Sequence, residues 1–313
     1  MKKLSIVFLI LLTAISCTTS NVSNYESTVN ETVLDEFSQL LEKAEAGDAD
    51  AQYKVGDCFK NGKGVEQNYG EAVYWHTKAA EQGNDSAINE LGFCYYEGKG
   101  IEQDYDAAYS LWVKAEKQGN VKSMNNLGFC YFEGKGVEQD YKQSFDWWTK
   151  ASEQGYFKAQ DNLGISYYYG YGVEPDYEKA AYWWTKSAEQ GYAPSQMNLA
   201  SCYYSGSGVE LDFEKAALWF SKAAEQDSPV AQYYMGYLYA DGEGVEKDID
   251  KTIYWWTKAA EQDLVNAQYM LGALYEIGDD IEQDYEKAVY WYTKAADQGY
   301  EDAQTALDNL SKI

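Results

Sequence analysis

The chain has 313 residues and a formal net charge of −26, with 51 acidic residues against 25 basic ones, all of them lysine. Aromatic residues make up 16% of the sequence and hydrophobic residues 45%, which is too apolar for a disordered acidic tail. This charge excludes a nucleic-acid binder and direct adhesion to anionic lipid, while the lack of arginine and the single histidine, His76, exclude arginine clamps and multi-histidine metal sites.

The first sixteen residues have the pattern of an export signal. Two lysines precede an apolar run from Leu4 to Leu12, which is shorter than the roughly 20 residues that span a bilayer. The small residues before Cys17 resemble a bacterial lipobox, which implies that Cys17 is lipidated and becomes the mature N-terminus. We therefore predict a signal peptide at residues 1–16 and a flexible linker at residues 17–32, rich in Ser, Thr and Asn. Ordinary secretory cleavage near Ser16 is the alternative.

The chain from residue 51 to residue 302 is one 36-residue motif written seven times. One column of the repeat is lysine in every unit: Lys78, Lys114, Lys150, Lys186, Lys222, Lys258 and Lys294. Another is glutamine in every unit: Gln82, Gln118, Gln154, Gln190, Gln226, Gln262 and Gln298. A fixed period of this length predicts a solenoid, in which each unit buries its apolar face against its neighbours.

Each unit reads as two helices joined by a glycine turn. In the second unit, apolar residues from Ala87 to Tyr95 recur on one helical face, and Gly98-Lys99-Gly100 ends that helix. Asp104 then offers an N-cap for a second helix over residues 105–118. The sequence therefore predicts an all-α, right-handed solenoid of seven 36-residue helix–turn–helix repeats.

The repeated motif resembles the Sel-1-like repeat, a relative of the tetratricopeptide repeat. The clearest copy runs from Leu163-Gly164 to Gln190-Gly191, and the resemblance covers residues 51–302. It implies a helical scaffold, because most members of that family are non-catalytic scaffolds, adaptors or secreted bacterial interaction proteins. Some exported members act in host contact, and others protect the producing cell from its own toxins.

The flanking segments are expected to cap the solenoid. Residues 33–50 resemble the second helix of a degenerate leading unit, and residues 303–313 resemble the first helix of an unfinished last one. Terminal units of solenoids are atypical because one of their faces meets solvent. The last repeat itself departs from the motif at Gly278-Asp279-Asp280, where the second loop glycine is missing.

The cysteines of the repeats are expected to be free and buried. Cys58, Cys94, Cys130 and Cys202 share one column, with one cysteine per unit. Neighbouring helices pack about 8–10 Å apart, whereas a disulfide needs Cα atoms about 4.4–6.8 Å apart. The column therefore predicts small core residues rather than bridges or zinc ligands.

No motif points to catalysis, a metal or a cofactor. An acidic residue follows each glycine turn, as Glu102 does, and would repel phosphate. His76 stands in a column of aromatic residues, so it is expected to pack as one of them. A catalytic pair should break the repeat, and the sequence shows no such pair.

The irregular columns of the first helices are the candidate binding surface. On a helical wheel they lie opposite the regular core columns, on the side that solenoids expose in a concave groove. The predicted protein-binding residues are Asn89, Phe93, Tyr96, Asn125, Phe129, Phe132, Tyr168, Tyr204 and Tyr237. The alternative, which stays open, is that these side chains fill the seams between neighbouring first helices.

The sequence therefore predicts a non-catalytic scaffold at the bacterial cell envelope, held by lipid on Cys17. Its partner is expected to be a basic protein, its contact with the membrane to be through the lipid alone, and its state to be monomeric. A host-contact or toxin-immunity role follows from the resemblance. A hydrolase acting on cell-wall or β-lactam-like substrates is the alternative from another class.

Overall fold

The computed structural model describes residues 36–278 and 280–311, and the described residues form helices and turns without a strand. The predicted signal peptide (1–16), the lipidated Cys17 and the linker (17–32) lie outside the described residues. The chain divides into two compact units: the first ends at Trp147 and the second begins at Trp148.

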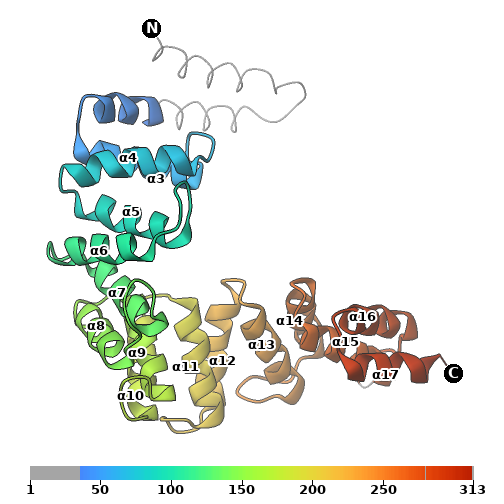
Figure 1. Cartoon of the computed structure of the whole chain (residues 1–313). Helices are drawn as coiled ribbons and strands as arrows, with labels where there is room; N and C mark the ends of the chain where they lie inside the picture. Colours follow the sequence, from blue (N-terminus) through green and yellow to red (C-terminus); the bar gives the residue numbers. More distant parts are fainter. Residues whose placement is uncertain (1–35, 279, 312–313) are drawn as a thin grey trace, which may run out of the picture. The chain divides into compact units, whose positions relative to one another are not determined.

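The first unit begins with a helical segment at residues 36–45. It continues with α3 (Ala49–Asn61), α4 (Tyr69–Glu81), α5 (Asp85–Glu97), α6 (Tyr105–Glu116), α7 (Val121–Glu133) and the first half of α8 (Tyr141–Glu153). In Figure 1 these helices follow one another in pairs. The second helix of a pair packs on its own first helix and on the first helix of the next pair, as α4 does on α3 and α5.

The second unit repeats the same arrangement. After the end of α8 it contains α9 (Phe157–Tyr169), α10 (Tyr177–Ala188), α11 (Ala193–Ser205), α12 (Phe213–Ala224), α13 (Pro229–Asp241), α14 (Ile249–Glu261), α15 (Val265–Ile277), α16 (Tyr285–Asp297) and α17 (Glu301–Leu310). Consecutive helices pack against each other throughout the unit. The prediction of an all-α solenoid of helix pairs is confirmed.

The helix ends follow the polar and glycine positions of the motif. Asp104 has extended backbone, and its carboxylate accepts a hydrogen bond of 2.9 Å from the backbone N–H of Ala107, as expected for the N-cap of α6. The helix ends at Glu116, two residues before the predicted end. Gly98 ends α5 with a left-handed φ of 67°, which favours glycine because a Cβ would be strained there.

The second loop glycine has two separate reasons to be small. Gly100 has a φ of 75°, and a Cβ on it would lie 2.2 Å from the carbonyl oxygen of Tyr69 in the preceding second helix. In the last repeat Asp280 stands at this position and still adopts a φ of 60°. The left-handed turn is therefore kept in the last repeat without the glycine, and the Asp280 carboxylate lies 2.7 Å from the Lys247 ammonium.

The centre of each repeat pairs a glycine of the first helix with a large ring of the second. A Cβ on Gly92 would lie 2.6 Å from Nε1 of Trp112, whose indole is 2% exposed and donates a hydrogen bond of 3.1 Å to the Asn89 carbonyl. The fifth repeat has Ala200 instead, and there the facing ring is the smaller Phe220. Each ring therefore fills the space that its partner leaves.

Buried glutamines tie successive repeats together. The Gln232 side chain is fully buried, and its Nε2 donates to the Ala224 carbonyl at 3.2 Å. Its Oε1 accepts a hydrogen bond of 2.8 Å from Gln262, one member of the constant glutamine column. The same pair recurs as Gln82 with Gln52 and Gln298 with Gln268, which gives the constant column a structural role.

Candidate binding face

The first helices of both units carry one position that changes from repeat to repeat. Its occupants are Asp57, Phe93, Phe129, Ile165, Ser201, Tyr237 and Ala273. None of these seven side chains is fully buried. We call this column and the predicted aromatics beside it the first-helix face, and describe it separately in the two units.

In the first unit, Phe93 is the most accessible of the predicted binding residues, with 39% of its side chain exposed. Tyr96 is half-buried, and its ring centroid lies 5.4 Å from that of Trp112. The Tyr96 hydroxyl donates to the Glu133 carboxylate, and burial together with this bond raises the pKa of the phenol. The Lys135 ammonium lies 4.9 Å from the centroid of the same ring, so one side of Tyr96 is covered by a cation.

Phe129 and Phe132 are half-buried on α7. The Phe132 ring centroid lies 5.2 Å from that of Tyr141, at the start of the following helix. Phe132 therefore packs partly against the following helix, and both aromatics keep part of their surface accessible. Their predicted role in binding stays a prediction.

Asn89 and Asn125 are not accessible, so the expectation that they face a groove is wrong. They are 4% and 3% exposed, respectively. The Oδ1 atom of Asn89 accepts hydrogen bonds from Ser123 Oγ at 2.9 Å and from Asn126 Nδ2 at 3.1 Å, both in the next repeat. Asn89 is buried because it satisfies polar groups in the seam between two first helices, and we remove both asparagines from the face.

In the second unit, the corresponding seam residue is a buried acid. Asp161 is 6% exposed and accepts hydrogen bonds from Ser195 Oγ at 2.6 Å and Asn198 Nδ2 at 3.4 Å. Burial raises the pKa of Asp161, and the two hydrogen bonds act against that rise. The position therefore joins repeats in both units.

The three predicted tyrosines of the second unit are half-buried and pack against the aromatic rings of the core. The distances between ring centroids are 5.5 Å for Tyr168 and Trp184, and 6.4 Å for Tyr204 and Phe220. Tyr237 packs edge-on against a tryptophan of its own pair and donates to Met270 Sδ at 3.3 Å. Each tyrosine thus has one packed side and one accessible side, and its role in binding is a prediction that the geometry permits.

Sequence reasoning missed a polar cluster at the start of the first-helix face. The Lys60 ammonium lies 2.7 Å from Glu90 Oε2 and 3.3 Å from Asp57 Oδ1, which joins the first helices of two repeats. His76 is fully buried behind them, with Nε2 3.7 Å from Asp57 Oδ1. The signal for this cluster was the charge of Asp57 and Lys60, which stand in columns that carry aromatic residues in several later units.

His76 packs where the other repeats place an aromatic ring, as expected. A Cβ on Gly56 would lie 2.1 Å from Cδ2 of the imidazole, in the same way that Gly92 meets an indole. Burial lowers the pKa of His76 from its ordinary value of 6.5, although the charges of Asp57 and Glu90 act in the opposite direction. The ring is therefore neutral at pH 7.

This burial predicts a loss of stability in mild acid. Above pH 6.5 the histidine is neutral in both the folded and the unfolded chain, so it adds no pH dependence. Below pH 6.5 the unfolded chain takes up a proton that the folded ring resists, and stability falls by at most about 1.4 kcal/mol per pH unit. Urea unfolding between pH 7.5 and 5 should show this loss in the wild type and a smaller one in His76→Phe, whose phenyl ring has a counterpart in Phe220. Parallel pH curves for the two proteins would contradict the assignment.

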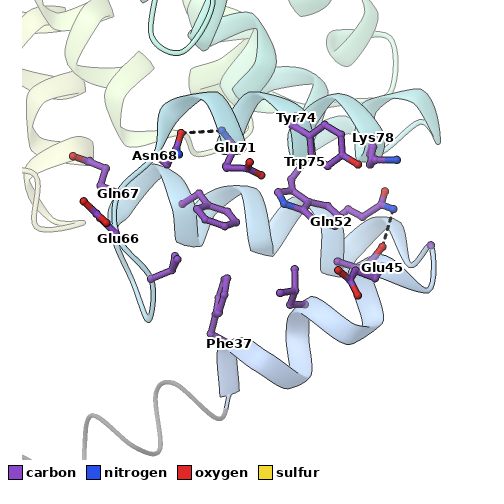
Figure 2. Close-up of a pocket in the computed structure, with 15 residues that line it drawn as sticks. Phe37, Glu45, Gln52, Glu66, Gln67, Asn68, Glu71, Tyr74, Trp75 and Lys78 are labelled. Atoms are coloured by element: carbon purple, nitrogen blue, oxygen red, sulfur yellow. Dashed lines mark hydrogen bonds between the residues drawn. The ribbon is translucent and has the colours of Figure 1, made fainter. Parts of the chain in front are cut away.

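A cavity of about 730 Å³ lies on another side of the first unit (Figure 2). Phe37 and Trp75 form part of its apolar lining, and Glu66 and Glu71 stand at its edge. None of its lining residues belongs to the first-helix face.

The four repeat cysteines are free, as the column predicted. Cys94, Cys130 and Cys202 are buried, and burial raises the pKa of each thiol, to about 11 for Cys94 and about 12 for the other two. Cys58 is half-buried, so the expectation of full burial is wrong for this residue. Within the described residues there is no group of three or more metal-ligating side chains. No helix in that part of the chain has both the length and the apolar character needed to cross a membrane.

The sequence profile of the Sel1 repeat matches the chain seven times, at residues 49–84, 85–120, 121–156, 157–192, 193–228, 229–264 and 265–300. The expected number of repeats is confirmed, in a register that starts two residues earlier than ours. Comparison with curated protein sequences finds no match.

Solved structures of similar repeat proteins exist in several bacteria. A protective antigen from uropathogenic Escherichia coli strains is 36% identical over 88% of this chain, with a TM-score of 0.77, and this chain spans 59% of its length. A Sel1 repeat protein from Oxalobacter formigenes is 32% identical, with a TM-score of 0.67, over 90% of this chain and 81% of that one. An immunity protein from Pseudomonas aeruginosa, 21% identical over 69% of this chain and 81% of its own, has a TM-score of 0.50 and shares the fold alone.

Proposed function

The chain belongs to the Sel1 repeat family, and on that premise we propose that it is a non-catalytic scaffold that binds a protein through its first-helix face. Sel1 repeats generally serve as scaffolds for protein–protein contacts. One observation carries the proposal: the position of Phe93, which is 39% exposed, holds a different kind of residue in almost every repeat. A packing position keeps its residue type, as the Gly92 column nearly does, so a changing and accessible position is available to a partner.

A basic partner fits the charge of the chain. The net charge of −26 would attract a cationic protein over long range and repel an anionic one. On the face itself, Glu97 lies 3.5 Å from Lys99 and Glu133 lies 2.6 Å from Lys135, so the attraction comes from the net charge of the chain rather than from these two carboxylates. The association rate with such a partner should therefore fall as salt rises.

We extend the proposal to the cell envelope, with the lipid on Cys17 as the anchor. Its support is the export pattern of residues 1–16 and the lipobox-like residues before Cys17. The similarity to a protective antigen favours host contact over toxin immunity as the biological setting, because the immunity-protein likeness extends to the fold alone.

Shortening two face aromatics should weaken binding without unfolding the protein. Phe93→Ala combined with Phe129→Ala removes two accessible rings, and each such ring at a binding hot spot contributes about 2 kcal/mol or more. The measurement is the Kd for a partner captured by cross-linking from an envelope fraction, together with the Tm of each variant. We expect a loss of affinity of at least tenfold and a Tm close to that of the wild type.

The matched control is Trp112→Ala, which removes a ring that is 2% exposed. This variant should cost about 3–5 kcal/mol of folding stability, so its main effect should be a fall in Tm. If the phenylalanine pair lowers the Tm as much as the tryptophan variant does, the residues of the face serve packing and the proposal fails.

The lipid anchor has a test of its own. Cys17→Ser should move the protein from the membrane fraction to the soluble fraction, and an unchanged distribution between the two fractions would exclude the lipid.

A further inference from the structure

A small pocket interrupts the first-helix face of the second unit. Its volume is about 330 Å³, and it lies between α9, which contributes Ile165 and Tyr168, and α11, which contributes Ser201 and Ser205. Trp184, the core ring of the same repeat, also lines it. This volume is at the lower end of the range for ligand pockets, about 300–1,000 Å³, and suits one side chain rather than a whole cofactor.

The pocket exists because two serines replace large residues of the motif. Ser201 occupies the column in which Phe93, Phe129 and Tyr237 place a ring. Ser205 occupies the column of Tyr169, which remains 62% exposed at the rim. The cavity thus lies where the next repeat places the ring of Tyr237 and the preceding repeat places Ile165.

The serine and asparagine side chains around the pocket already have partners, whereas the Trp184 indole N–H is buried without one among the described residues. The Ser201 hydroxyl donates to the Met197 carbonyl at 3.0 Å, and the Ser205 hydroxyl donates to the Ser201 carbonyl at 2.8 Å. Both hydroxyls are therefore turned back on their own helix. Asn198 Nδ2 likewise points to Asp161 Oδ1, at 3.4 Å. A ligand that needs several free donors, such as a sugar, finds few here.

The lining carries no charged side chain, although the chain as a whole has a net charge of −26. A charged group placed in the pocket would lose its water without gaining an ion pair, which is costly. An aromatic ring would instead meet the rings of Tyr168 and Trp184, which already pack against each other with centroids 5.5 Å apart.

We propose that this pocket takes an aromatic side chain of the protein partner, which fills the place left by Ser201 and Ser205. The proposal rests on the proposed function, because it names the anchor residue that the first-helix face recognises. A buried aromatic anchor in a pocket is the arrangement that contributes most to binding at protein interfaces. The net negative charge of the chain attracts the basic residues of the partner, and the pocket selects the aromatic one.

The test uses N-acetyl-phenylalanine amide as the probe and the full chain of the protein. We expect the probe to shift the backbone amide NMR signals of residues 198–207 at millimolar concentration. Ser201→Phe should fill the pocket from within and weaken probe binding at least tenfold, and Ser205→Tyr should do the same independently. Ile277→Phe, which adds the same ring in the column of Ser205 two repeats away, at a residue that is 68% exposed, is the matched control and should bind the probe like the wild type.

Equal probe binding by Ser201→Phe and the wild type, in variants of unchanged Tm, would overturn the proposal. So would tighter binding of N-acetyl-aspartate amide or of diacetylchitobiose than of the phenylalanine amide, since these mark a polar or sugar site. The same variants separate this proposal from the proposed function. If the partner binds Ser201→Phe as tightly as the wild type, the pocket assignment fails and the scaffold stands. If the wild type binds the probe but captures no protein, the scaffold function fails and the aromatic preference of the pocket stands.

Discussion

Replacing Gln232 by glutamate should destabilise the protein by about 3–5 kcal/mol at pH 7, since it leaves an uncompensated charge in the interior. The Gln232 side chain is fully buried, and its amide serves as donor to the Ala224 carbonyl and as acceptor from Gln262. A carboxylate keeps the acceptor, loses the donor and faces a carbonyl oxygen with its negative charge. The loss should appear as a large fall in Tm, because α12, α13 and the end of α14 all meet at this side chain.

The matched control is Gln232→Met, because the third repeat has a methionine, Met124, in the column of Gln232. This variant removes one of the two hydrogen bonds that the Ala224 carbonyl accepts, the other coming from the Asp227 N–H, and it removes the acceptor of Gln262. The cost is about 1–3 kcal/mol, but no charge is buried. Acidification should reduce the difference in folding stability between the two variants, because the introduced glutamate becomes neutral. Equal stability of the two variants at pH 7 would show that the lost hydrogen bonds, and not the charge, decide the position.

A Cβ added at Gly92 should cost about 1–3 kcal/mol by overpacking, and a smaller facing ring should recover part of that loss. The added atom would lie 2.6 Å from Nε1 of Trp112, whose indole is held by its hydrogen bond to the Asn89 carbonyl. The ring therefore has little freedom to move away. The chain itself contains the compensated pair, Ala200 with Phe220.

The measurement is a double-mutant cycle with Gly92→Ala, Trp112→Phe and the combination. Trp112→Phe alone opens space and leaves the Asn89 carbonyl without the indole, so it is also destabilising. The combination should lose less than the sum of the two single variants, with a coupling of at least 0.5 kcal/mol. Additive losses would mean that the glycine and the ring do not share one space.

The order and type of the helices could be predicted from the sequence because solenoid contacts are local and repeat. Asp104, Gly98 and the period of 36 mark helix starts, turns and repeats without reference to distant residues. The free cysteines followed from the same argument, since one cysteine per unit places the thiols on separate helices. His76 could be assigned to a packing role because its column is otherwise aromatic.

Only the tertiary structure decided which of the irregular residues are exposed to solvent and which are packed against the next repeat. The sequence treated Asn89 and Phe93 alike, as two residues on the same side of one helix. In the structure Asn89 is 4% exposed and bonded to the next repeat, whereas Phe93 is 39% exposed. One turn of helix separates a seam from a surface, and the difference depends on the neighbouring repeat rather than on the helix itself.

The pocket and the polar cluster were hidden from the sequence for the same reason. Ser201 and Ser205 are unremarkable residues until the packed repeat shows that no other side chain fills the place of the missing ring. The approach of Lys60 to both Asp57 and Glu90 requires two first helices at a fixed separation. Periodicity fixes which residues form the core, but the space left between repeats depends on side-chain volumes that only the packed structure brings together.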